Sequence, residues 1–292
     1  MKQISVVGSI SMDLVVESDR RPSAGETVIG SAFHTVPGGK GANQAVAIAR
    51  LGGHVEMVGC IGDDANGVAI RQNFETEHVG TTHLQTIAKE RTGTAHITLA
   101  EGDNSIVVVQ SANLAVVYDE NQLDSLLGQA DMILLQLEIP LATVKQVARY
   151  GKTHGIPVVL NPAPAIVLDD ELLEDVTYLT PNEHECGLIF GQQQPLEHWL
   201  SQYPNKLIVT EGSRGARFYD GDAIVTVPAI KTDVVDTTGA GDTFNGALAV
   251  SLTEGTSLTE AIRFANKAAG MSVRALGAQG GMPTREQMEV ES

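Results

Sequence analysis

Seven consecutive residues combine the groups that are needed to bind an anion. Positions 236–242 read Asp-Thr-Thr-Gly-Ala-Gly-Asp, with two glycines, two acids and two threonines. Gly239 and Gly241 permit backbone conformations that other residues rarely adopt, and an apolar helical pattern follows from Phe244. The backbone N–H groups of Gly239, Ala240 and Gly241 would then lie at a helix N-terminus, where unpaired donors and the helix dipole attract anions. The segment therefore predicts an anion-binding site.

The carboxylate of Asp242 would lie in the first turn of that helix, beside the anion. From there it could take a proton from a hydroxyl that attacks a bound phosphate. The structural alternative is that Asp242 and Thr243 only cap the helix. The common phosphate-loop patterns do not apply, because no GxxxxGK followed by Ser or Thr occurs and Phe244 stands where GxGxxG needs its third glycine.

Two further segments offer hydroxyl-binding groups near the N-terminus. Residues 37–43 read Pro-Gly-Gly-Lys-Gly-Ala-Asn and lead into a helix. Their glycines would let the backbone approach a ligand, while Lys40 and Asn43 offer donors; the alternative is a loop-to-helix junction with a solvated lysine. Asp13 follows the first strand and could accept hydrogen bonds from a sugar, or it could simply form a turn.

Three other strand ends carry polar residues. Glu138 closes the apolar strand that begins at 132. Asn182 and Glu185 are three apart at a helix start, where they could hold a hydrated Mg²⁺ or form a capping box. Residues 209–215 read as strand, glycine turn and strand, which could wall a nucleotide pocket or be only a tight connection.

Short apolar runs alternate with amphipathic helical segments along the chain. Buried parallel strands are predicted at 4–7, 55–58, 132–135, 158–160 and 207–209. Helices are predicted at 42–51, 66–77, 141–154, 182–190, 243–253 and 258–273. This alternation predicts an α/β fold, with a doubly wound, mostly parallel sheet flanked by helices on both faces. Ligands bind beyond the carboxyl ends of strands in such sheets.

Two regions break the alternation and predict a small β-sheet. Residues 10–36 contain strand-like pieces around a turn at 21–25, and residues 92–110 read as a hairpin with its turn at 101–104. Together they predict a lid that projects from one domain spanning 1–292.

The composition excludes several classes of function. The formal net charge is −17, which disfavours binding to nucleic acid or anionic membranes, so an anionic substrate must be held by local donors. Cys60 and Cys186 are far apart, without a metal-binding spacing. No apolar run of 18 residues occurs, and the N-terminal residues lead directly into a strand pattern. These features predict a cytoplasmic protein with reduced thiols.

The chain resembles the ribokinase/phosphofructokinase-B family over residues 6–279. The two signatures that carry the resemblance are Gly-Gly-Lys-Gly-Ala-Asn-Gln-Ala at 38–45 and Asp-Thr-Thr-Gly-Ala-Gly-Asp-Thr-Phe at 236–244. The resemblance implies ATP-dependent phosphorylation of the 5-hydroxyl of D-ribose, with Mg²⁺ required, K⁺ as an activating cation, and a homodimer that forms through the β-lid.

The resemblance also implies a role for individual residues. It implies that Asp242 is the catalytic base and that the anion hole is formed by Gly239, Ala240 and Gly241. It implies sugar contacts from Ser11, Asp13, Gly39, Lys40, Asn43, Glu138 and Asp242. It implies nucleotide and Mg²⁺ contacts, the latter through water, from Asn182 and Glu185, and further nucleotide contacts from Thr210, Gly212, Ser213, Gly241 and Asn266. It implies a K⁺ site at Asp236, Thr238, Ser272, Gly277 and Gly281.

Two positions depart from the family pattern, and two alternative functions follow. Ser11 replaces an asparagine that binds sugar, which makes deoxyribose a credible substrate, and Gly281 replaces a serine that donates an oxygen to the cation. One alternative is a kinase for deoxyribose, another sugar or a nucleoside, although Lys40 and Glu138 indicate a small, hydroxyl-rich sugar. The other is a non-catalytic sugar-binding regulator, against which the intact Asp242 argues.

Overall fold

A six-stranded parallel sheet forms the centre of the molecule. The computed structural model describes residues 2–291. The strands lie in the order β10–β9–β8–β1–β4–β5, and every neighbouring pair is parallel. Their bounds are β1 (Gln3–Val7), β4 (His54–Gly62), β5 (Leu84–Ile87), β8 (Met132–Leu135), β9 (Val158–Leu160) and β10 (Tyr178–Leu179). The chain proceeds from β1 to one edge and then returns to build the other, so the order reverses beside β1, where such sheets bind ligands.

Helices cover both faces of this sheet. Successive strand residues enter different hydrophobic clusters: Met132 and Leu134 of β8 lie in one, and Ile133 and Leu135 in the other. The first cluster is completed by α1 (Lys40–Arg50), α2 (Ala65–Thr76), α8 (Ala240–Thr253), α9 (Leu258–Ser272) and α10 (Arg285–Val290). The second is completed by α3 (Glu120–Leu127), α4 (Leu141–His154), α5 (Asp170–Asp175), α6 (Glu183–Phe190) and α7 (Leu196–Gln202). The predicted fold class is therefore confirmed.

The last predicted parallel strand differs from its prediction. β11 (Ile208–Thr210) pairs antiparallel with β12 (Ala216–Tyr219), which pairs with β13 (Ile224–Val227). Only isolated parallel bridges, Leu179 to Leu207 and Asn182 to Thr210, connect β11 to the main sheet. The cause is the short turn through η2 (Gly212–Arg214) and Gly215, whose φ of 99° brings the chain back on itself.

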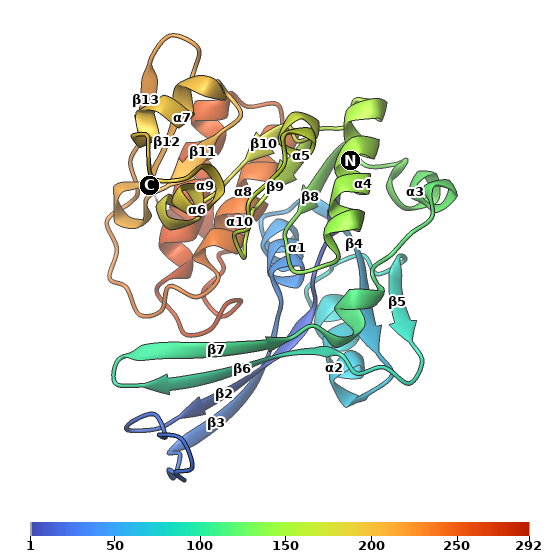
Figure 1. Cartoon of the computed structure of the whole chain (residues 1–292), viewed down its shortest axis with the longest axis vertical. Helices are drawn as coiled ribbons and strands as arrows, with labels where there is room; N and C mark the ends of the chain where they lie inside the picture. The colour runs from blue at the N-terminus through green and yellow to red at the C-terminus, as the bar shows by residue number, and fades with distance from the viewer. Residues whose placement is uncertain (1, 292) are drawn as a thin grey trace.

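Four strands form a separate sheet that extends away from the helix-covered body (Figure 1). They are β2 (Ser11–Glu17), β3 (Ala32–Gly38), β6 (Gly93–Ala100) and β7 (Asp103–Val109), in the order β3–β2–β6–β7. The central pair β2–β6 is parallel and the outer pairs are antiparallel. The hairpin turn is shorter than the predicted 101–104: only Glu101 and Gly102 turn, both at positive φ, because two-residue turns of this hand match strand twist.

Between the hairpin and α3, the chain forms a short 3₁₀ helix, η1 (Ser111–Ala115). Its Asn113 accepts a hydrogen bond from the Ile10 N–H at 2.9 Å and donates to the Ile10 carbonyl at 2.8 Å. This pair of bonds anchors the projecting sheet at its base, where β2 leaves the main body. None of the helices within residues 2–291 has the length and apolar character that crossing a bilayer requires.

Candidate active site

The N-terminus of α8 is shaped by a glycine in the left-handed region. Gly239 is the N-cap residue, with φ 77° and ψ 0°. A Cβ at this position would lie 2.5 Å from the Ala278 carbonyl oxygen, so no larger residue fits without movement. Gly241 is exposed, and a Cβ there would have no atom within 4 Å. At Gly241 the first turn of α8 thus borders open space, as an anion site requires, while the Ala240 N–H donates to the Thr237 carbonyl at 3.2 Å.

Asp242 does not cap this helix. Its side chain is buried, and Oδ2 accepts a hydrogen bond from Asn43 Nδ2 at 3.0 Å. Oδ1 accepts one from Gln44 Nε2 at 3.1 Å. Burial raises the pKa of Asp242 above its ordinary value, although Lys40 and the two amide donors act in the opposite direction. A buried carboxylate with a raised pKa beside an anion site has the properties of a general base.

A second buried carboxylate, Asp13, lies at the start of the projecting sheet. Ser11 Oγ donates to its Oδ1 at 3.0 Å. A Cβ on Gly38 of the neighbouring strand would lie 2.4 Å from the carboxylate, so that glycine makes room for it. Burial raises the pKa of Asp13 to about 6; the Ser11 hydroxyl lowers it, and the negative charges of Glu138 and Asp242 raise it further. Ser11 therefore supports Asp13 directly.

The charges of Glu138 and Lys40 act on both carboxylates, Asp13 and Asp242. Glu138 Oε2 accepts hydrogen bonds from Ser9 Oγ at 2.5 Å and from the Lys40 N–H at 3.2 Å. Burial opposes the charge of the Lys40 side chain, but Asp242 and Glu138 outweigh it, so the pKa of Lys40 is raised. One cation thus lies among several acids, and such a group of polar side chains suits a ligand with many hydroxyl groups.

Gly39 allows α1 to begin close to β2. It is the N-cap residue of α1 at φ 93°, and a Cβ there would lie 2.7 Å from the Ser11 nitrogen. A cavity of about 200 Å³ continues from Asp13 beneath the projecting sheet. Its lining is largely apolar and includes Val36, Ile97, Ile106 and Leu276. The cavity therefore lies between the projecting sheet and the residues Asp236, Thr238 and Gly277.

Replacement of Asp13 by asparagine is expected to stabilise the protein while weakening sugar binding. The pKa change from 3.8 to about 6 corresponds to roughly 3 kcal/mol of penalty on the ionised folded state. The wild type carries this penalty fully above about pH 6 and loses it as the pH falls towards 3.8. Thermal melts should therefore show a higher Tm for Asp13→Asn at pH 7.5 and no difference near pH 4. An unchanged Tm at pH 7.5 would contradict the raised pKa.

Asn182 and Glu185 form a complete capping box at the start of α6. The Asn182 side chain accepts from the Glu185 N–H, and the Glu185 side chain accepts from the Asn182 N–H, both at 2.8 Å. The structural alternative for this pair is therefore present. The negative charge of Glu185 also raises the pKa of Lys40. Each bond uses one oxygen lone pair, so the remaining lone pairs are available to a hydrated cation.

The residues predicted to contact nucleotide lie in two places. Thr210 ends β11 and Gly212 and Ser213 lie in η2 just after it; a Cβ on Gly212 would meet no atom within 4 Å. This turn is held by the buried Glu211, which binds Arg217 Nε at 2.9 Å. Asn266 on α9 is buried, and its amide donates to the Val227 and Pro228 carbonyls at 2.8 and 3.3 Å, so it holds the end of β13.

The residues of the predicted K⁺ site come from two segments. Asp236 and Thr238 precede α8, whereas Ser272 ends α9 and Gly277 and Gly281 lie in the loop after it. Burial opposes ionisation of Asp236, but hydrogen bonds from Thr238 and the Gly277 N–H outweigh it and lower the pKa of Asp236. A Cβ on Gly281 would lie 1.9 Å from the Ser272 carbonyl oxygen, so a serine would need a backbone shift here. Within residues 2–291, no cluster of three or more acidic, histidine or cysteine side chains is suited to a metal.

Sequence reasoning missed several residues that hold these groups. Gln44 supports Asp242 directly. Gln279 Nε2 donates to Asn43 Oδ1 at 3.0 Å, and Arg50 Nη1 donates to the Gln279 carbonyl at 2.6 Å, so the loop after α9 is tied to α1. The available signal for Gln44 was a second uncharged polar residue directly after Asn43, with the apolar run 45–49 following it. Gln279 and Arg50 gave no such signal, because their contacts are more than 200 residues away in sequence.

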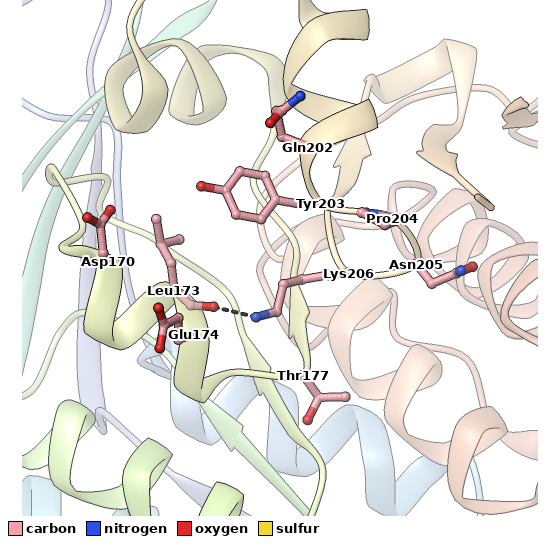
Figure 2. A pocket seen from close by; sticks show the side chains of 9 residues that line it. All are labelled: Asp170, Leu173, Glu174, Thr177, Gln202, Tyr203, Pro204, Asn205 and Lys206. Carbon is pink, nitrogen blue, oxygen red and sulfur yellow. Dashed lines mark hydrogen bonds between the residues drawn. The ribbon is translucent and has the colours of Figure 1, made fainter. Parts of the chain in front are cut away.

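Another hollow, of about 660 Å³, lies at the amino ends of β10 and β11 (Figure 2). It is lined by Thr177, which precedes β10, and Lys206, which precedes β11, together with residues of α5. Lys206 Nζ donates to the Leu173 carbonyl, and burial followed by the charge of Lys152 lowers the pKa of Lys206. Its lining includes none of Asp13, Lys40, Glu138 and Asp242.

Comparison with known proteins gives full-length matches. The family model described as pfkB family carbohydrate kinase matches residues 1–285. Ribokinase from Bacillus subtilis is 53% identical over 291 residues, which cover 99% of each chain. Deoxyribokinase from Salmonella typhi is 35% identical over 297 residues, covering 97% of this chain and 96% of that protein. The structure of Arabidopsis thaliana ribokinase complexed with ribose and ATP matches with a TM-score of 0.91 at 34% identity, covering 99% of this chain and 98% of that one. The chain therefore belongs to the pfkB family of carbohydrate kinases.

Proposed function

We propose that this carbohydrate kinase transfers the γ-phosphate of ATP to O5 of D-ribose. The observation that carries the proposal is the buried Asp242 carboxylate, held by two amide donors at the start of α8 and facing the Lys40, Glu138 and Asp13 cluster. The similarity to ribokinases, among them one bound to ribose and ATP, supports ribose as the acceptor and ATP as the donor.

The proposed reaction gives separate tasks to the residues that bind the sugar and to the start of α8. Asp13, Lys40 and Glu138 orient the hydroxyls of the sugar so that O5 lies near Asp242. As the bond from O5 to the γ-phosphorus forms, Asp242 takes the O5 proton, and the bond from that phosphorus to the β-phosphate oxygen breaks, which releases ADP. The N–H groups at the start of α8 hold the negative charge that develops on the transferred group.

Two cations and the nucleotide residues complete the proposal. Asn182 and Glu185 would hold Mg²⁺ through water, and Mg²⁺ would neutralise charge on the phosphates. Asp236, with Thr238, Ser272, Gly277 and Gly281, would hold K⁺. Thr210, Gly212, Ser213 and Asn266 would line the nucleotide site. A cytoplasmic location also belongs to this proposal, because ATP is the donor and Cys60 and Cys186 are buried free thiols.

We further propose a homodimer through the lid. A strand with one buried face buries alternate residues, yet every residue of β7 is exposed. The exposed apolar side chains of the lid include Phe33, Ile106, Val107, Val108 and Val109. A second copy packed against the lid would remove this apolar surface from water.

Deoxyribose is the alternative acceptor that a specific observation favours. Ser11 is engaged with Asp13 and is shorter than the family asparagine, and the Salmonella relative is named deoxyribokinase. A coupled ADP-release assay with ribose, deoxyribose, fructose and adenosine, with and without K⁺, tests the proposal. We expect the highest kcat/KM for ribose, with activation by K⁺. A higher value for deoxyribose would make deoxyribose the substrate, whereas no ADP release with any acceptor would favour a sugar-binding regulator.

A further inference from the structure

The side chain of Gln44 lies entirely inside the protein and is directed at the base. Its Nε2 donates to Asp242 Oδ1 at 3.1 Å and to Asn161 Oδ1 at 3.2 Å. The other oxygen of Asp242 accepts from Asn43, the preceding residue of α1. Consecutive helix residues point roughly 100° apart, so the two donors reach the carboxylate from different directions. Together they fix the plane in which the carboxylate lies.

Gln136 decides which way the Gln44 amide faces. Its Nε2 donates to Gln44 Oε1 at 2.7 Å, so the Gln44 nitrogen must face the carboxylate of Asp242. Gln136 is fully buried directly after β8, and its own Oε1 has no hydrogen-bond partner among residues 2–291. A Cβ on Gly8 would lie 2.0 Å from that oxygen, so Gly8 leaves space for it. A buried acceptor without a partner is unfavourable and calls for a compensating role.

A second arm of the same network reaches the anion hole. Asn161, which accepts from Gln44, donates to the Thr180 carbonyl at 3.4 Å. Thr180 Oγ1 donates to Asn245 Oδ1 at 2.6 Å, and Asn245 Nδ2 donates to the Gly241 carbonyl at 2.8 Å. These side chains come from β9, β10 and α8, or follow them directly. A single buried chain of hydrogen bonds thus joins the base to the backbone at the start of α8.

We propose that Gln44, oriented by Gln136, is a positioning residue that aligns the Asp242 carboxylate with the acceptor hydroxyl. The inference rests on the proposed role of Asp242 as the base. Gln44 is fully buried and acts through Asp242 rather than on the substrate. The hydrogen bonds that continue from Gln44 also fix the position of Asp242 relative to the N–H groups that bind the transferred phosphate.

The charged groups around Asp242 make the effect of Gln44 measurable. Burial raises the pKa of Asp242, and Lys40 on α1 lowers it. Glu138 after β8 raises it, and the charge of Asp242 in turn raises the pKa of Asp13 on β2. Gln44 lowers it by donating a hydrogen bond. The three charged groups remain when Gln44 is replaced, so loss of its donor should raise the pKa of Asp242. The acidic limb of the kcat profile should therefore move to higher pH.

The test compares four variants of the full chain in the ADP-release assay, one of them Asp242→Asn. Gln44→Met keeps the length of the side chain and removes the donor, and Gln136→Met leaves Gln44 free to turn. For Gln44→Met we expect kcat to fall roughly 10- to 100-fold, with both KM values changed less than about threefold. Its acidic limb should move to higher pH, and Gln136→Met should change kcat and the limb in the same direction by less. Thr143→Val is the control, because it removes a buried 2.7 Å bond to the Val116 carbonyl far from the base.

The outcomes separate this inference from the proposed function. If Asp242→Asn is inactive while Gln44→Met keeps the wild-type kcat and pH profile, positioning by Gln44 is overturned and the base role stands. If Asp242→Asn turns over normally, the proposed function itself fails. If circular dichroism shows that Gln44→Met does not fold, Gln136→Met decides, and an unchanged acidic limb overturns the inference. The same shift in Thr143→Val would also overturn it.

Discussion

Replacement of Asp242 by asparagine is expected to lower kcat at least ~100-fold, because general-base catalysis contributes that much. Asparagine keeps the shape of the side chain but cannot accept the proton of the attacking hydroxyl. Binding should persist, since Asp13, Lys40 and Glu138 still orient the sugar and the start of α8 is unchanged. Steady-state kinetics give kcat, and calorimetric titration with ribose and with ATP measures binding separately.

Asparagine also brings a donor to a place where two donors already meet. Asn43 Nδ2 and Gln44 Nε2 both point at the carboxylate, so the new NH₂ group would face one of them. Asp242→Ala therefore serves as a second variant, because it removes the base without adding a donor. Both variants should lose turnover to a similar extent. Turnover near the wild-type value in Asp242→Ala would contradict the base role.

Replacement of Gly239 by alanine is expected to disrupt the anion hole. Its φ of 77° is unfavourable for alanine, and the new methyl would lie 2.5 Å from the Ala278 carbonyl oxygen. Relief of that contact must move the start of α8, which carries the N–H groups of Ala240 and Gly241. Loss of one such donor costs on the order of 100-fold in kcat. We expect a loss of that size in steady-state kinetics, together with a lower Tm.

Gly255→Ala is the matched control at the other end of α8. Gly255 also has a positive φ, 88°, but a Cβ there would meet no atom within 4 Å. The backbone penalty should be similar, on the order of 1 kcal/mol, while the anion hole stays in place. Gly255→Ala should therefore lose stability but keep kcat. If both variants lose kcat equally, the effect comes from general destabilisation and not from the anion hole.

The central sheet could be predicted well from sequence because its strands are buried on both faces. Met132–Leu135 and Val158–Leu160 have the predicted bounds, since unbroken apolar runs leave little ambiguity. β11 was placed correctly along the chain but not in the sheet, because pairing depends on the turn at Gly215 rather than on the run itself. The lid strands were located, but β2 and β6 pair in parallel through residues 82 apart in sequence, such as Ser11 and Gly93, which local patterns do not encode.

The site residues that could be predicted from sequence are those whose residue type permits few chemical roles. Asp242 and Gly239 stood out because an acid and a flexible glycine at a helix start have few roles. Gln44 did not, because an amide acquires its role only from the groups around it, here Asp242 and Gln136. Asn182 shows a further limit, because the same spacing serves a cap and a cation site, and the cap is formed in the structure.

The most direct test of the account is the identity of the product formed from ribose and ATP. We would incubate the enzyme with ATP, Mg²⁺, K⁺ and ¹³C-labelled D-ribose and follow the reaction by ³¹P and ¹³C magnetic resonance. The account predicts one sugar phosphate, with phosphorus coupling at C5, formed in step with ADP, and no product with Asp242→Ala. Phosphate on another hydroxyl, or ADP formed without any sugar phosphate, would contradict it.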